Sequence, residues 1–144
     1  EGAGGALGQL ADLDAVRADH LDRLNRLRRD ADRPPLRASA ALDRTAQAYA
    51  ERMLREGFYG HVSPDGGDVM DRVQAMRYPA RAAGENLGTG QRTLVRVIDD
   101  WLDSPPHRAN LLNRSFREVG LGVIATPGDD GPTVLWVQVF GTPR

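Results

Sequence analysis

The stretch VGLGVIATPGDDGPTVLWVQVFG, residues 119–141, decides the fold class of this 144-residue chain. Apolar and small residues alternate over 119–126, and β-branched and aromatic residues dominate 133–141. A period of two is typical of half-buried strands. The segment between them, TPGDDGP (126–132), is rich in residues that form turns. The pattern predicts an antiparallel hairpin.

Upstream of this hairpin the apolar spacing changes to the period of 3.6 residues that indicates helices. Helix starts and stops are marked by serine, threonine, proline and glycine at the expected positions. We predict five helices, over about residues 10–30, 39–57, 68–77, 93–102 and 104–113. Helices followed by a terminal hairpin predict an α+β fold, in which the helices pack on a small antiparallel sheet.

The composition excludes several classes of protein. The net charge is -1, which gives no sign of a nucleic-acid partner or of an anionic membrane surface. No run approaches the roughly 20 apolar residues of a transmembrane helix. The chain has no cysteine, so disulfides, thiolate metal sites and cysteine nucleophiles are excluded. All 19 basic residues are arginine, which we interpret as a genome composition bias and not as a set of contacts that lysine could not make.

Two glycines in the first predicted strand allow two interpretations. Gly120 and Gly122 share one strand face, opposite Val119, Leu121 and Val123. The missing side chains either leave room for a cleft beside Glu118 or allow a helix to pack closely on the strand. The pattern alone favours neither.

The three histidines can be considered one by one. His20 lies near the apolar stripe of the first helix, and we expect it to be a structural histidine. His61 lies in the turn-rich stretch FYGHVSPDG. His107 lies in the first turn of the helix SPPHRANLLN, where Ser104 is predicted to cap the first N–H groups and two prolines stiffen the approach. Taken singly, each of the latter two would more often be structural than functional.

Two glutamates, together with His61 and His107, provide the residue types of a metal site. Glu85 lies between glycines in GENLG, and Glu118 precedes the first strand of the hairpin. Zn²⁺ accepts imidazole nitrogen and carboxylate oxygen. No H-E-x-x-H motif places such groups on one helix, so any convergence must come from the tertiary fold.

Four stretches, in their order and spacing, resemble the CAP superfamily. This superfamily comprises the cysteine-rich secretory proteins, antigen 5 and the pathogenesis-related 1 proteins, and its domain is also called the SCP domain. The likeness is greatest to the cysteine-free bacterial branch and covers about residues 18–141. The four stretches are FYGHVSPDG (58–66), GENLG (84–88), SPPHRANLLN with FREVGLGV (104–123) and WVQVFG (136–141).

The resemblance implies an α-β-α sandwich, with a small antiparallel sheet between helical layers. A single CAP domain would span residues 18–144, after a Gly-rich segment (1–17) that leads into the first helix. The resemblance also implies a cleft lined by a His-Glu-His-Glu set. Matched position by position, this set is His61, Glu85, His107 and Glu118, which would hold a divalent metal such as zinc. Glu85 and Glu118 are also the candidate catalytic residues if the protein is an enzyme.

Three functions remain open. Our first hypothesis is a secreted bacterial binding module with a metal-competent cleft, for an unidentified small-molecule, lipid or peptide ligand. The alternative is a metal-dependent hydrolase that acts on peptides or cell-wall material. A third hypothesis treats the four residues as a buried polar network that stabilises the fold. We expect a monomer without nucleic-acid partners, exported by a signal encoded upstream of Glu1.

Overall fold

The computed structural model describes residues 12–126 and 133–144, and its centre is a four-stranded sheet in the order β1-β3-β4-β2. Strands β3 (Glu118–Thr126) and β4 (Thr133–Pro143) pair antiparallel, with Gly120 opposite Val139. The predicted hairpin is therefore confirmed, and it forms the middle of the sheet. The turn predicted between its strands falls mainly on 127–132, outside the described residues.

The two outer strands are absent from the sequence-based prediction. Strand β2 (Ala80–Thr89) pairs antiparallel with β4 and contains the GENLG stretch. Its glycines serve packing, because a Cβ at Gly84 would lie 2.7 Å from the ring of Phe116. Strand β1 (Arg37–Ala38) pairs parallel with β3. The sheet is therefore mixed and not purely antiparallel, although the α+β class is as predicted.

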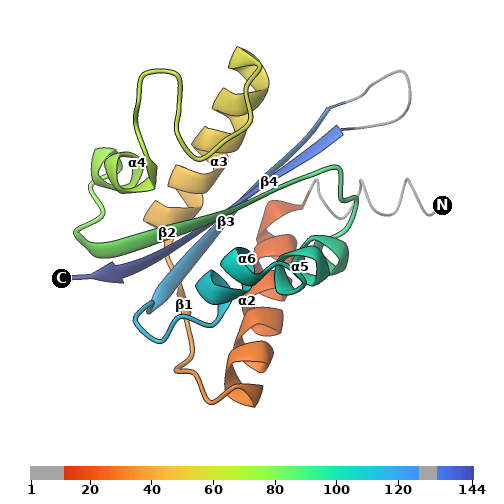
Figure 1. Cartoon of the computed structure of the whole chain (residues 1–144), viewed down its shortest axis with the longest axis vertical. Coiled ribbons are helices and arrows are strands. Elements are labelled where there is room, and N and C mark those ends of the chain that lie inside the picture. Colours follow the sequence, from red (N-terminus) through yellow and green to blue (C-terminus); the bar gives the residue numbers. More distant parts are fainter. Residues whose placement is uncertain (1–11, 127–132) are drawn as a thin grey trace.

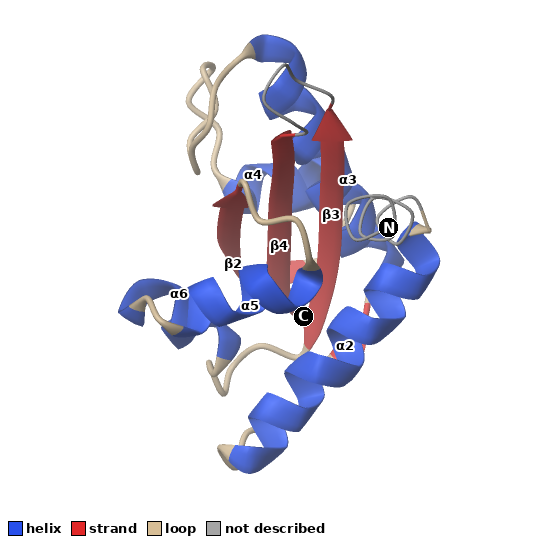
Figure 2. Ribbon diagram, turned by 90° about the vertical axis from the view of Figure 1, so that its right-hand side faces the viewer, coloured by secondary structure: helices blue, strands red, loops and turns tan. Residues whose placement is uncertain are grey.

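All five predicted helices are present, and they cover both faces of the sheet (Figures 1 and 2). One face packs against α2 (Leu13–Asp30), α5 (Leu94–Leu102) and α6 (Pro105–Leu111). The other face packs against α3 (Ala40–Glu56) and α4 (Val69–Ala75). None of the described helices is both long enough and apolar enough to cross a membrane.

Helix α3 lies directly on the strand that carries Gly120 and Gly122. A Cβ at Gly120 would lie 2.2 Å from the backbone carbon of Leu42, and a Cβ at Gly122 would lie 2.4 Å from that of Ala46. Close helix packing, and not an open cleft, is therefore the reason for these two glycines.

The same close approach lets α3 cover the edge of β3 beyond the short strand β1. The Asp43 carboxylate accepts a hydrogen bond from the N–H of Leu121, and the Gln47 amide oxygen accepts one from Val123, both at 2.9 Å. These side chains replace the ladder bonds that a longer neighbouring strand would supply, so the edge is not left open for other chains.

His20 is a buried structural histidine, as predicted. The residue is 2% exposed, and its Nε2 atom accepts a hydrogen bond from the Gln138 side-chain amide at 2.9 Å. Burial disfavours the charged imidazolium and lowers the pKa of His20 from 6.5 to about 3. The neutral ring is therefore part of the folded core at neutral pH.

Acidification should destabilise the protein through His20. Below pH 6.5 the unfolded chain binds a proton on this residue that the folded protein does not bind until the pH approaches about 3. Neutral His20 therefore contributes its full stabilisation above pH 6.5. As the pH falls from 6.5 towards about 3, the free energy of unfolding decreases by up to about 1.4 kcal/mol per pH unit. Urea unfolding of the wild type and of His20→Gln at pH 7, 6 and 5 measures this loss. The variant should lose less stability with acid, and parallel pH curves would show that His20 is not responsible.

Candidate functional site

Glu85 is buried in the middle of β2 and is held by two cationic or ionisable partners. Its Oε1 atom lies 2.9 Å from Nδ1 of His61, and Nη2 of Arg72 donates to Oε1 at 3.0 Å and to Oε2 at 2.8 Å. The Glu85 side chain is only 2% exposed. Because a buried carboxylate is costly without such partners, these bonds compensate its burial and hold the side chain in position.

Arg72, on α4, organises the loop that carries His61. Its guanidinium donates to the backbone carbonyls of Gly67 and His61 and stacks 3.5 Å from the centre of the Tyr49 ring. The hydroxyl of Tyr49 donates to the carbonyl of Gly60 at 2.5 Å. Sequence analysis missed Arg72, because one arginine among 19 basic residues carries no local signal.

His107 lies in the first turn of α6, and its Nδ1 atom lies 2.8 Å from the hydroxyl of Ser104. The predicted capping role of the Ser104 side chain is wrong: Ser104 occupies the N-cap position, but its hydroxyl contacts the imidazole instead of a backbone N–H. Burial, and then the positive charge that His61 can carry, lower the pKa of His107. The ring of His107 is therefore neutral at pH 7, in the state that a metal requires.

Glu118 has a different set of partners. The hydroxyl of Tyr78 donates to its Oε1 at 2.7 Å, and Arg37 lies 3.4 Å from its Oε2. The Tyr78 ring covers Gly141, where a Cβ would lie 2.7 Å from the ring. Burial, followed by the bond to Glu118, raises the pKa of Tyr78. Tyr78 was also missed from the sequence, since its partner lies 40 residues away.

The structure thus brings only some of the four predicted site residues into contact with one another. His61 contacts Glu85, and the positive charge that His61 can carry lowers the pKa of His107 further after burial, whereas the bonds of Glu118 go to Tyr78 and Arg37. Within residues 12–126 and 133–144, no three histidine, aspartate or glutamate side chains form a group that could hold a metal.

The donor atoms nevertheless fit a site built on two imidazoles. The bonds to Glu85 and Ser104 use the Nδ1 atoms of His61 and His107 and leave the Nε2 atom of each ring for an added ligand. Metal-binding histidines commonly hold their other ring nitrogen in this way, often against a carboxylate. In this geometry Glu85 would orient the His61 ring through its Nδ1 atom, without contacting the metal. Direct ligation by Glu85 or Glu118 stays a prediction.

A buried polar network also runs along the face of the sheet that α2 and α6 cover, and it consists of other residues. His20 bonds to Gln138, which accepts from Asn86 at 2.9 Å, and Asn86 accepts from Asn110 at 2.9 Å. Asn86 also donates to the backbone carbonyl of His107 at 3.1 Å. The network therefore ties α2 and β4 to the start of α6, where the imidazole of His107 is mounted.

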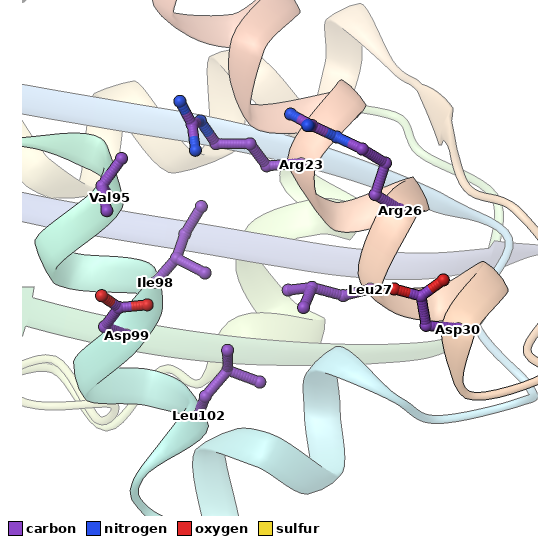
Figure 3. Close-up of a pocket in the computed structure, with 8 residues that line it drawn as sticks. All are labelled: Arg23, Arg26, Leu27, Asp30, Val95, Ile98, Asp99 and Leu102. Atoms are coloured by element: carbon purple, nitrogen blue, oxygen red, sulfur yellow. The ribbon is translucent and has the colours of Figure 1, made fainter.

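A groove of about 300 Å³ lies between α2 and α5, in the helical layer that also contains α6 (Figure 3). Leu27, from α2, points toward Ile98 and Leu102 of α5, so apolar side chains form its floor. Charged side chains stand around it, namely Arg23, Arg26, Asp30 and Asp99. An apolar floor with a charged rim is suited to an amphipathic ligand.

Comparisons with known proteins agree with the resemblance seen in the sequence. The profile of the cysteine-rich secretory protein family matches residues 21–140. The uncharacterized protein YkwD of Bacillus subtilis is 30% identical over 106 residues, which are 74% of this chain and 39% of that protein. The chain therefore spans less than half the length of this relative.

Solved structures show the same fold. An extracellular protein of Bacillus anthracis that contains an SCP domain superposes with a TM-score of 0.79 and 27% identity, over 90% of this chain and 41% of the other. An outer surface protein of Borrelia burgdorferi superposes with a TM-score of 0.74 and 23% identity, over 86% and 90% of the two chains. At this lower identity the second likeness supports the fold alone.

Proposed function

The chain belongs to the cysteine-rich secretory protein family, and from that premise we propose that it is an extracellular binding module that holds a divalent metal between His61 and His107. The observation that carries this proposal is the way in which hydrogen bonds orient the two imidazole rings. Each Nδ1 atom is engaged, by Glu85 or by Ser104, and each Nε2 atom remains available. A bound zinc ion would supply a Lewis-acidic position for an oxygen of the ligand.

The environment of Glu85 favours binding over hydrolysis. A hydrolase that activates a metal-bound water also needs a general base with access to that water. Both oxygens of Glu85 accept bonds from Arg72, and its side chain is almost completely buried. Glu118 is held by Tyr78 and Arg37. Neither carboxylate can act as a base without losing these partners.

We further propose that the module binds a ligand with apolar character in the groove between α2 and α5, which neither His61 nor His107 lines. Its floor of Leu27, Ile98 and Leu102 would bury an acyl chain, a small apolar molecule or an apolar peptide side chain. Extracellular action is proposed from the likeness to the Bacillus anthracis protein, which is described as extracellular. Fractionation of the source cells tests it, and a strictly cytoplasmic protein would contradict it.

We expect Zn²⁺ to bind through the two imidazoles. Isothermal titration at pH 7.5 should show one ion per chain, and His61→Ala or His107→Ala should each weaken binding at least tenfold, because a single imidazole is a poor site. Glu85→Gln should weaken it less, since the residue would act through His61. The pKa of His107 lies below 6.5, so its proton should compete with zinc only at pH values lower than that.

His20→Gln is the control, because His20 is buried in the core and reaches the backbone of His107 only indirectly, through Gln138 and Asn86. It should bind zinc as the wild type does. Undiminished binding after both His61 and His107 are replaced would refute the site. Hydrolysis of casein or of cell-wall material with added zinc, lost in Glu85→Gln, would favour the hydrolase instead.

A further inference from the structure

A second pocket, of about 410 Å³, lies at the end of the sheet where β2 and β3 begin and β4 ends. Three arginines line it, from three different segments: Arg37 on β1, Arg81 on β2, and Arg117 immediately before β3. The rest of its lining is small or polar, and no acidic side chain of the described residues contributes to it. Arginine residues from three segments therefore border one concave surface.

A β-bulge places Arg81 in this pocket. Ala80 pairs with Pro143 and Ala82 pairs with Thr142, so Arg81 is an extra residue in β2. Bulges change the direction of a side chain and are frequent beside functional sites. Within residues 12–126 and 133–144, Arg81 takes part in no ion pair and no side-chain hydrogen bond. Its charge is therefore left for a group from outside the chain.

Arg117 is held in place without a carboxylate partner. Its backbone N–H donates to the carbonyl of Gly141 at 3.0 Å, and its Nη1 atom donates to the carbonyls of Arg114 and Phe116. No ion pair of Arg117 occurs in the part of the chain that the structure describes. These bonds orient the guanidinium in advance, so less entropy is lost when it binds a ligand.

Arg37 completes the set at the margin of the pocket. It lies 3.4 Å from Glu118, but its side chain is 74% exposed, so much of its charge still faces solvent. The whole chain has a net charge of -1. The concentration of positive charge at this end of the sheet is therefore a local feature and not the consequence of a basic protein.

We propose that this pocket binds the phosphate group of a small phosphate ester. Guanidinium groups bind phosphate oxygens through paired, charge-assisted hydrogen bonds, which makes arginine the preferred residue for such sites. Ser115 belongs to the same lining, and a serine hydroxyl can donate a further bond to phosphate. A water molecule occupies about 30 Å³, so the pocket also has room for the alcohol part of the ester. A free ester and a phospholipid head group share this chemistry.

Titration with sn-glycerol 3-phosphate at low ionic strength tests the proposal. Arg81→Gln and Arg117→Gln should each weaken binding by about tenfold, since each removes a charge-assisted contact. The double variant should show no measurable binding. Arg55→Gln is the matched control, because Arg55 is exposed in the last turn of α3, whereas the pocket lies near the start of that helix. The Arg55→Gln variant should bind glycerol 3-phosphate with the affinity of the wild type. Arg37 is left intact because it contacts Glu118, so zinc binding should be the same in the double variant.

Vesicles distinguish the two sources of the phosphate. Wild-type protein that floats with phosphatidylglycerol-containing vesicles but not with pure phosphatidylcholine, with loss of flotation in the double variant, assigns the pocket to a lipid head group. Binding of glycerol 3-phosphate without flotation assigns it to a soluble ester. Failure of the wild type to bind either probe, or equal binding by the double variant, would overturn the proposal.

Discussion

Replacing Arg28 with methionine should lower the free energy of unfolding by about 3 kcal/mol or more. Arg28 is fully buried at the end of α2. It donates to the carbonyl oxygens of Pro34, Leu111, Asn113 and Phe116, at distances of 2.7 to 3.3 Å. Methionine fills a similar volume but leaves four carbonyl acceptors without their donor, those of Leu111 and Phe116 in buried positions. Urea unfolding followed by circular dichroism measures the loss.

Two further variants make this test specific. Arg28→Lys keeps the positive charge but loses the planar fork of donors, so it should retain only part of the stability. Arg29→Met, on the exposed side of the same helix, should change stability by no more than about 0.5 kcal/mol. A loss in Arg28→Met no greater than in Arg29→Met would show that the carbonyl cluster does not hold α2 to the segment before β3.

Gly120→Ala should destabilise the protein by about 3 kcal/mol or more, although it adds a single methyl group. That methyl carbon would lie 2.2 to 2.6 Å from backbone atoms of Leu42 and Asp43. A backbone, unlike the end of a flexible side chain, cannot move aside alone, so α3 must shift away from β3. The shift would also lengthen the bond from Leu121 to Asp43. Overpacking of this kind commonly costs about 1–3 kcal/mol, and more where the backbone resists.

Gly60→Ala is the control for this substitution. A Cβ at Gly60 would meet no atom within 4 Å, so the change should be close to neutral. Thermal unfolding of the two variants beside the wild type gives the comparison. Equal melting temperatures for Gly120→Ala and Gly60→Ala would mean that α3 does not pack against β3 at the distance described.

The sequence by itself determined the elements whose pattern is local. Apolar residues repeat within one helix or one strand, and helix starts and stops are marked by nearby residues, so local patterns located five helices and the hairpin of β3 and β4. The ordered motifs around His61, Glu85, His107 and Glu118 were enough to recognise the family. His20 could be assigned to the core because it lies beside an apolar stripe on its own helix.

The tertiary structure decided what depends on residues far apart in the chain. Strand β2 was missed because its glycines, which accommodate Phe116 and Val97, weaken the strand pattern. Whether Gly120 faced a cleft or a helix depended on where α3 packs. The partners of Glu85 and Glu118 are supplied by Arg72 and Tyr78, whose positions follow from the path of the chain around the sheet. A one-dimensional pattern records which side of an element is apolar, but not which distant polar atom lies opposite it.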